Sequence, residues 1–257
     1  MLKKKSLGQH FLHNAHYVRA VADAGQVVAG DTVLEVGPGD GALTREMLSR
    51  GAVVLAVEKD HRLIPLLQET FKTEIVREQL YLMEGDALDL PPARIGLRSG
   101  KFKVVANIPY NITGALLRML LSGEAQPSAV VVLVQKEVAR RITDKKESLL
   151  SLSIKAYGTP EYIKTVPRGA FTPPPNVDSA ILRVADISRT RFASPEHEAR
   201  FFALIKAGFA QKRKLLRRNI ERLLGSETLS LMQQAGISEN ARAEQVPLEK
   251  WLLLAAK

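Results

Sequence analysis

The stretch Asn107-Ile108-Pro109-Tyr110 directly follows the apolar run 104–106, and its residue types suit chemistry on an amino group. The side-chain carbonyl of Asn107 and the main-chain carbonyl of Ile108 can accept both hydrogens of an exocyclic amine such as that of adenine. This contact would free the nitrogen lone pair for attack on a methyl group. Pro109 stiffens the backbone that holds the acceptors, and Tyr110 offers a face on which a flipped base can stack. The alternative is a turn after a strand, with Tyr110 as an aromatic at the edge of the core.

A glycine-rich stretch, residues 35–41, reads Glu-Val-Gly-Pro-Gly-Asp-Gly and lies between an expected strand and the helix after it. Gly37 and Gly39 would let the backbone contact a ligand and make the turn that starts the helix. The stretch also fits the G-x-G-x-x-A form of a dinucleotide fingerprint, which ends here at Ala42. The glycines alone therefore indicate a nucleotide-type ligand without deciding which one.

Two acidic residues follow the next two expected strands. Glu58 comes about 20 residues after the glycines, where a carboxylate can accept hydrogen bonds from ribose hydroxyls. Asp86 is placed to accept a hydrogen bond from an adenine amino group. The alternatives are a solvated charge at a strand end for Glu58 and a helix N-cap for Asp86. Since nicotinamide and adenosyl cofactors would both use Glu58, a nicotinamide oxidoreductase remains an alternative function.

Apolar runs that resemble strands alternate with helical patterns between residues 32 and 134. This alternation predicts right-handed crossovers and a mostly parallel sheet that is covered on both faces. In such a sheet, ligands bind beyond the carboxyl ends of the strands, at the point where the strand order reverses. The expected strands are residues 33–36, 53–57, 80–83, 104–106 and 129–134.

The pattern of apolar residues changes after a proline-rich loop at 171–179 and a last expected strand at 180–184. Beyond Asp186 there are helix patterns only. We therefore expect an α/β domain over residues 1–187, whose first 30 residues form an N-terminal lid and helical segment. A small all-helical domain is expected over residues 188–257.

The chain carries a net charge of +10, which favours a polyanionic partner, nucleic acid before an anionic membrane surface. A generally basic composition without such a partner is the alternative. Cations gather in one helical stretch of the tail, where they are expected to contact RNA phosphates unless they form only a solvated helix face. The candidate RNA-binding residues are Lys212, Arg213, Lys214, Arg217 and Arg218.

The sequence contains no cysteine, which excludes disulfides, thiolate nucleophiles and cysteine-based zinc sites. His10, His13 and His16 have no acidic cluster beside them, so no metal site is expected. The N-terminus lacks the apolar stretch of a signal peptide, and no run is long enough to span a bilayer. We therefore expect a cytoplasmic protein that does not act at a membrane.

Taken together, these motifs make the sequence resemble the ribosomal RNA adenine dimethyltransferases of the small subunit, the KsgA/RsmA family. The resemblance runs from end to end. Its motifs are Ser6–Leu12, Glu35–Gly39, Asn107–Tyr110, Gln135–Ala139, Phe171–Ser179, Ala210–Lys214 with Arg217–Asn219, and Arg242–Gln245.

The resemblance implies a Rossmann-like methyltransferase domain with a mostly parallel seven-stranded sheet, followed by the helical domain. It implies transfer of methyl groups from S-adenosylmethionine, which becomes S-adenosylhomocysteine, to N6 of two adjacent adenines in the 3′-terminal hairpin of 16S rRNA. No metal is implied. The expected partner is 16S rRNA in an assembling 30S subunit, with a role in ribosome biogenesis, and the protein is expected to be a monomer.

The resemblance also assigns roles to residues. Phe171 would stack on the face of the target adenine opposite Tyr110, so that the catalytic set is Asn107, Ile108, Pro109, Tyr110 and Phe171. Position 10 is Asn in many relatives, and the histidine here keeps a donor and an acceptor. The cofactor contacts would be His10, Leu12, Gly37, Gly39, Glu58, Asp86 and Asn107.

Two related functions remain as alternatives. The large-subunit adenine methyltransferases that confer macrolide resistance share the glycine loop and the 107–110 motif, but they are not expected to share Arg242–Gln245. A non-catalytic ribosome-assembly factor would keep only the scaffold, and the intact set of Gly37, Glu58, Asp86 and Asn107 argues against it.

Overall fold

The computed structural model describes residues 10–257, and these divide into two units by their internal packing. The first unit is the described part of residues 1–139 together with Pro160–Ile187, and the second is Arg140–Thr159 together with Ser188–Lys257. Residues 6–9 of the Ser6–Leu12 motif lie outside the described residues. No helix within residues 10–257 is long and apolar enough to cross a membrane.

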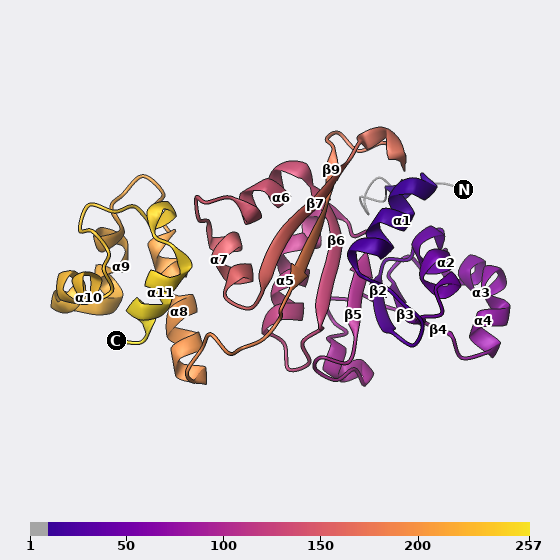
Figure 1. The fold of residues 1–257 in the computed structure, drawn as a ribbon, viewed down its shortest axis with the longest axis horizontal. Coiled ribbons are helices and arrows are strands. Elements are labelled where there is room, and N and C mark those ends of the chain that lie inside the picture. Colours follow the sequence, from indigo (N-terminus) through magenta and orange to yellow (C-terminus); the bar gives the residue numbers. More distant parts are fainter. Residues whose placement is uncertain (1–9) are drawn as a thin grey trace. The chain divides into compact units, whose positions relative to one another are not determined.

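The first unit contains the expected mostly parallel sheet of seven strands, in the order β4-β3-β2-β5-β6-β9-β7 (Figure 1). Strands β4, β3, β2, β5 and β6 run parallel to one another, and β9 pairs antiparallel with β6. This arrangement confirms the Rossmann-like prediction. The strands are β2 Thr32–Val36, β3 Val53–Glu58, β4 Leu80–Glu84, β5 Lys103–Ala106, β6 Ala129–Gln135, β7 Thr159–Val166 and β9 Ser179–Ala185.

Both faces of the sheet are covered, as the near-continuous apolar strands predict. In β6, Val131 and Leu133 join a core that includes Val21 of α1 and Met47 of α2, while the intervening Val132 is equally buried from the opposite face. The helices of this unit are α1 Ala15–Ala24, α2 Ala42–Ser49, α3 Ile64–Thr70, α4 Lys72–Val76 and α5 Thr113–Ser122. Short 3-10 helices cover Pro92–Ile95, Tyr110–Ile112 and Arg168–Ala170.

A second, very small sheet holds the N-terminal segment in place. Strand β1, Phe11–Leu12, pairs antiparallel with β8, Phe171–Thr172, so that Leu12 lies opposite Phe171. The side chain of Asn14 then caps α1 by accepting a hydrogen bond from the amide of His16 at 3.0 Å. The described part of the expected lid segment is therefore one short strand followed by one helix.

The second unit is helical and packs around Trp251, whose side chain is fully buried and donates through Nε1 to the carbonyl of Val246. Leu152 and Ala156 belong to the same core as Phe201 and Leu204. The helices are α7 Leu149–Lys155, α8 Pro195–Gly208, α9 Leu216–Leu224, α10 Thr228–Gln234 and α11 Leu248–Ala255, with 3-10 helices at Gly225–Glu227 and Ala243–Gln245. Helix α6, Lys136–Thr143, begins in the first unit and ends in the second.

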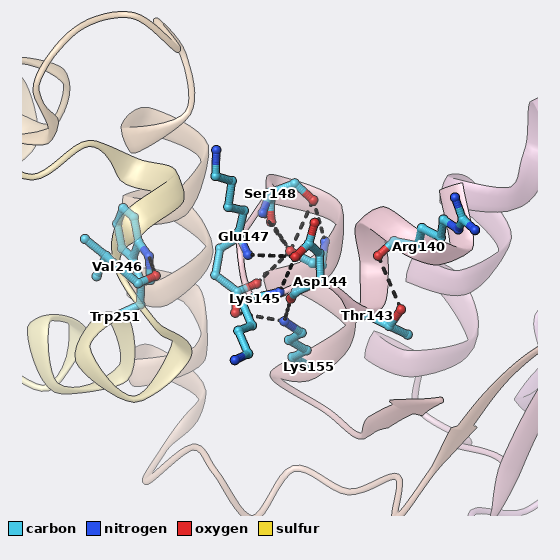
Figure 2. Close-up of polar contacts among 11 residues, drawn as sticks. Arg140, Thr143, Asp144, Lys145, Glu147, Ser148, Lys155, Val246 and Trp251 are labelled. Carbon is cyan, nitrogen blue, oxygen red and sulfur yellow. Dashed lines mark hydrogen bonds and ion pairs between the residues drawn. The ribbon is translucent and has the colours of Figure 1, made fainter. Parts of the chain in front are cut away.

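Residues 140–159 therefore pack with the helical tail, although the expected boundary assigned them to the α/β domain. Polar contacts stabilise the segment 140–159, as Figure 2 shows for Glu147 and its neighbours. The buried carboxylate of Glu147 accepts from Ser151 Oγ at 2.7 Å and pairs with Lys155 Nζ at 2.9 Å. Its amide donates to the carbonyl of Glu244, inside the Arg242–Gln245 motif. That motif thus holds a segment distant in sequence against the tail.

Candidate active site

A cavity of about 240 Å³ opens at the carboxyl ends of the parallel strands, in the first unit. The strand order reverses between β2 and β5, so the cavity lies at the switch point where ligands bind in such sheets. Its walls come from β1 and from the loops after β2, β3, β4 and β5. The structure brings together here His10, Leu12, Gly37, Gly39, Glu58, Asp86, Asn107, Ile108, Pro109 and Tyr110.

The glycine loop forms one wall and is in close contact with β1. Gly37 and Gly39 have φ angles of +70° and +63°, a backbone conformation that side chains with a Cβ rarely adopt. A Cβ at Gly39 would lie 2.7 Å from the ring of Phe11, and one at Gly37 would lie 4.0 Å from the main-chain oxygen of Asn107. The absence of a side chain at Gly39 therefore makes room for Phe11 of β1, and both glycines line the cavity.

The carboxylate of Glu58 is buried, with 5% of the residue exposed, so the solvated strand-end interpretation is wrong. Its Oε2 accepts from the amide of Gly39 at 3.1 Å, and its Oε1 accepts from the amide of Asp60 at 2.8 Å. Burial raises the pKa of Glu58, and these main-chain donors act in the opposite direction. Each oxygen keeps a further lone pair with which to accept a ligand hydroxyl.

Asp86 combines the capping role with a place on the cavity wall. Its Oδ1 accepts from the amide of Leu88 at 3.0 Å, which caps the following turn, and its Oδ2 pairs with Lys59 Nζ at 2.5 Å. The hydrogen bond from Lys59 and then that from Leu88 lower the pKa of Asp86. The carboxylate is therefore ionised at neutral pH and able to accept a hydrogen bond from a ligand amine.

The Asn107 amide is oriented by β1. Its Nδ2 donates to the main-chain oxygen of His10 at 2.8 Å, which fixes which end of the amide carries the acceptor. No group within residues 10–257 donates to Asn107 Oδ1 or to the main-chain oxygen of Ile108. Both residues line the cavity. The site thus holds two acceptors whose hydrogen-bonding capacity remains for a ligand.

Tyr110 lies on the cavity wall, half-buried, at the start of the 3-10 helix that leads into α5. Its hydroxyl forms a 2.6 Å hydrogen bond with Ser179 Oγ. Burial raises the pKa of the Tyr110 hydroxyl, so the phenol stays neutral. The ring of His10 lies nearly parallel to it, with 6.1 Å between centroids and 26° between planes. Tyr110 thus lies on the cavity wall, and its stacking on a base stays a prediction.

Phe171 is not among the described residues that line the cavity. Its side chain is 3% exposed and belongs to the core with Leu12 and Val166. Because β8 pairs with β1, Phe171 lies opposite Leu12, and its side chain packs in the core. The stacking of Phe171 on a target base stays a prediction.

Two cavity residues were not predicted from the sequence. Glu35, fully buried in β2, accepts from Thr44 Oγ1 at 2.6 Å, and burial raises its pKa to about 8. Asp60, also buried, pairs with Arg62 at 2.5 Å and donates its amide to Glu58. The sequence signal for Glu35 was an acidic residue inside an apolar strand, and the signal for Asp60 was a second acidic residue two positions after Glu58.

The candidate RNA-binding residues lie in the second unit. Lys212, Arg213 and Lys214 precede α9 and are exposed, as is Arg218, whereas Arg217 is half-buried and its Nε has no hydrogen-bond partner within residues 10–257. Leu216 and Ile220 form the buried side of α9, so its cations face outward. Over the described part of the chain, no three His, Asp or Glu side chains converge as metal ligands would.

Comparison with known proteins gives a consistent result. All of residues 1–257 match the family model described as ribosomal RNA adenine dimethylase. A protein of Dehalococcoides mccartyi named ribosomal RNA small subunit methyltransferase A is 41% identical over 98% of this chain and 87% of its own length. One of the same name from Caulobacter vibrioides is 39% identical over 99% and 96%.

Two solved structures share the fold over nearly the whole chain. The crystal structure of the 23S rRNA methyltransferase ErmE superposes with a TM-score of 0.73 at 25% identity, covering 96% of this chain and 98% of that one. A dimethyladenosine transferase from Plasmodium falciparum gives 0.76 at 24% identity, covering 95% and 96%. Both the sheet and the helical tail are therefore features that these proteins have in common with this chain.

Proposed function

This chain belongs to the ribosomal RNA adenine dimethylase family, and from that membership we propose that it methylates adenine amino groups of ribosomal RNA with S-adenosylmethionine as donor. The substrate that fits best is a pair of adjacent adenines in the 3′-terminal hairpin of 16S rRNA, each dimethylated at N6. The single observation that carries this proposal is the orientation of Asn107, whose Nδ2 is bound by His10 while Oδ1 is left to accept.

The cavity residues fit the donor. Gly37 and Gly39 leave the backbone open to close approach, Glu58 would accept from the ribose hydroxyls, and Asp86 would accept from the adenine amine. Bound S-adenosylmethionine supplies an electrophilic methyl group on a sulfonium centre. No metal is needed for this chemistry, because the leaving group is a neutral thioether.

The acceptors of the 107–110 motif fit the nucleophile. Asn107 Oδ1 and the Ile108 carbonyl would each accept one hydrogen of the target amine, which favours a pyramidal nitrogen whose lone pair can attack. Pro109, with φ at −58°, holds this turn rigid. Catalysis on this view rests on alignment of the two reactants, and the amine proton is lost to solvent after transfer.

The small subunit is favoured over the large one as the source of the substrate. Relatives named for the small-subunit enzyme are about 40% identical over nearly the whole chain, whereas the 23S rRNA methyltransferase ErmE is 25% identical. The Arg242–Gln245 motif adds support, because the main chain of Glu244 organises the second unit through Glu147. We further propose that Lys212, Arg213, Lys214, Arg217 and Arg218 contact phosphates of 16S rRNA.

The setting follows from the substrate. We further propose that the protein is cytoplasmic, acts as a monomer on an assembling 30S subunit and contributes to ribosome biogenesis. The net charge of +10 supports a polyanionic partner of this kind.

Incubation with tritiated S-adenosylmethionine and 30S subunits that lack the modification tests the proposal. The expected result is label on two neighbouring adenines near the 3′ end of 16S rRNA, with four methyl groups at completion. Label on 50S subunits instead would assign the large-subunit activity, and bound particles without label would assign a non-catalytic assembly factor. Binding of NADH but not of S-adenosylmethionine in calorimetry would overturn the methyltransferase assignment altogether.

A further inference from the structure

We propose that Asn219 is a positioning residue for RNA binding, whose side-chain amide holds the turn 211–214 in one shape and thereby fixes the arrangement of three cations. Those cations are Lys212, Arg213 and Lys214, which are all exposed. The proposal rests on the function proposed above, since it concerns how the candidate RNA-binding residues meet the phosphates of the substrate. Asn219 belongs to α9 and is half-buried, and it acts through the turn.

Residues 211–214 form a turn that a main-chain hydrogen bond closes. The amide of Lys214 donates to the carbonyl of Gln211 at 3.0 Å. This bond has the pattern of a β-turn, so Lys212 and Arg213 occupy its two central positions. The four residues include no glycine, proline, asparagine, aspartate or serine, which are the residue types that favour turns. The shape of this turn therefore depends on contacts from outside it.

The side chain of Asn219 supplies two such contacts. Its Nδ2 donates to the carbonyl of Gly208 at 2.6 Å and to the carbonyl of Gln211 at 3.1 Å. Gly208 is the last residue of α8, so the first bond satisfies one of the carbonyls that a helix leaves free at its C-terminus. The Gln211 carbonyl is the one that also closes the turn. One amide thus joins the end of α8 to the turn that follows it.

The helix that carries Asn219 is fixed in the core of the second unit. Leu216 and Ile220, on either side of Asn219 in α9, are fully buried in that core. An added Cβ at Gly208 would lie 3.0 Å from the Leu216 side chain and closer still to Trp251, so α8 ends in close contact with α9. Asn219 therefore connects the turn to a well-packed framework.

Holding the turn has a consequence for the binding of an anion. Adjacent cations repel one another, so on an unsupported loop they would spread apart and would have to be ordered when phosphates bind. On a turn that is held in advance, less conformational freedom is lost on binding. The fixed spacing of the cations then suits one arrangement of backbone phosphates, which positions the RNA without reading its sequence.

Two neutral substitutions test this role of Asn219. Asn219→Ala removes the amide, and Asn219→Leu keeps a branched side chain without a donor. Neither substitution changes the net charge, so a change in the salt dependence of binding cannot come from the number of charges. Thr228→Val is the matched control, because Thr228 Oγ1 donates to the main-chain oxygen of Gly225 at 2.7 Å elsewhere in the same unit.

The measurements are the affinity for 30S subunits that lack the modification at several salt concentrations, the two KM values, kcat and the melting temperature. We expect both Asn219 variants to bind subunits more weakly, by about 2- to 10-fold for each cation that must be ordered. The slope of log affinity against log salt should fall by about 1 or more. The kcat at saturating subunits and the KM for S-adenosylmethionine should not change, and Thr228→Val should lower only the melting temperature. An unchanged slope in both Asn219 variants would leave Asn219 a structural role alone and overturn the proposal.

A mutant cycle shows whether Asn219 acts through the cations. When Lys212, Arg213 and Lys214 are replaced by Ala, adding Asn219→Ala should weaken binding no further. The same loss in both backgrounds would overturn the proposal. If the triple variant binds like the wild type, the assignment of these cations as RNA contacts fails, and the role of Asn219 fails with it. If the wild type labels no subunits, the proposed function itself fails.

Amide hydrogen exchange in the free wild-type protein tests the turn without any substitution. The Lys214 amide should exchange more slowly than in an unstructured peptide, because the turn is closed before RNA binds. Exchange at the rate of an unstructured peptide would overturn the proposal, even if the Asn219 variants failed to fold.

Discussion

Asn107 Nδ2 donates to the main-chain oxygen of His10 at 2.8 Å, and this hydrogen bond joins the end of β5 to the N-terminal strand. The contact has a chemical consequence, because a side-chain amide can present either its donor or its acceptor to a ligand. With Nδ2 bound by His10, Oδ1 is the end left for an amine in the cavity. With the proposed role of Asn107, the N-terminal strand would influence the reaction through the orientation of one amide.

Replacing Asn107 by Ala should reduce turnover by roughly 10²–10³-fold, the usual effect of losing one aligned hydrogen-bonding group in an active site. Asn107→Asp tests the orientation separately. The aspartate keeps an acceptor oxygen, so this variant should retain part of the activity. It lacks the donor to the main-chain oxygen of His10, so β1 should be held less firmly. Single-turnover methylation of 30S subunits measures both effects. Near wild-type turnover in Asn107→Ala would contradict the assignment of Oδ1 as an acceptor.

Gly39→Ala should weaken cofactor binding as well as lower stability. At φ +63° an alanine is strained by about 1–2 kcal/mol, and its Cβ would lie 2.7 Å from the Phe11 ring of β1. Gly100→Ala is a matched control, because Gly100 has φ +72° but nothing within 4 Å of an added Cβ. Both variants should therefore melt earlier, and only Gly39→Ala should lose affinity for S-adenosylmethionine in calorimetry. Equal affinity of the two variants for S-adenosylmethionine would show that the contact between Gly39 and Phe11 does not affect cofactor binding.

Most of the strands that the sequence predicted are covered on both faces, and β4, at one end of the strand order with Tyr81 exposed, is the exception. Strand β6 is buried on both faces and is therefore a continuous apolar run. Such a run can be recognised in the sequence without knowing which strands pair with it. Strand β7 was not predicted, because its residues, Thr-Pro-Glu-Tyr-Ile-Lys-Thr-Val, contain no continuous apolar run. Several of them, including Ile163, are exposed and therefore need not be apolar.

Long-range packing could not be predicted from the sequence. No local pattern reveals that Phe171 pairs with Leu12 and that its side chain is buried. Residues 140–159 belong with the helical tail because Leu152 and Ala156 complete its core. The site residues from the strand ends were easier to predict, since parallel strands bring their carboxyl ends to one edge.

Glu35 should make the folded protein less stable as the pH rises from about 5 to 8. Its pKa is about 8 when folded, against an ordinary value of 4.5, so the folded chain holds one more proton than the unfolded chain between these values. The free energy of unfolding should therefore fall with rising pH, by up to about 1.4 kcal/mol per pH unit from this group.

Denaturant unfolding at several pH values, compared with Glu35→Gln, isolates the contribution of Glu35. The glutamine keeps an oxygen that can accept from Thr44, but it cannot titrate. The difference in unfolding free energy between the two proteins should change steadily across this pH window and level off above pH 8. Parallel curves would mean that Glu35 ionises in the folded protein at its ordinary pKa.

Replacing Lys212, Arg213 and Lys214 together by Ala should weaken binding to 30S subunits and make it less sensitive to salt. Each lost phosphate contact lowers the slope of log affinity against log salt by about 1. The matched control replaces Lys72, Arg77 and Lys101, three exposed cations of the first unit, and removes the same charge. Affinity measured between 50 and 200 mM salt, roughly the range over which such contacts are screened, should show a lower slope only for the variant of residues 212–214. Equal slopes in the two variants would show that net charge, and not this basic stretch, governs attraction to the RNA.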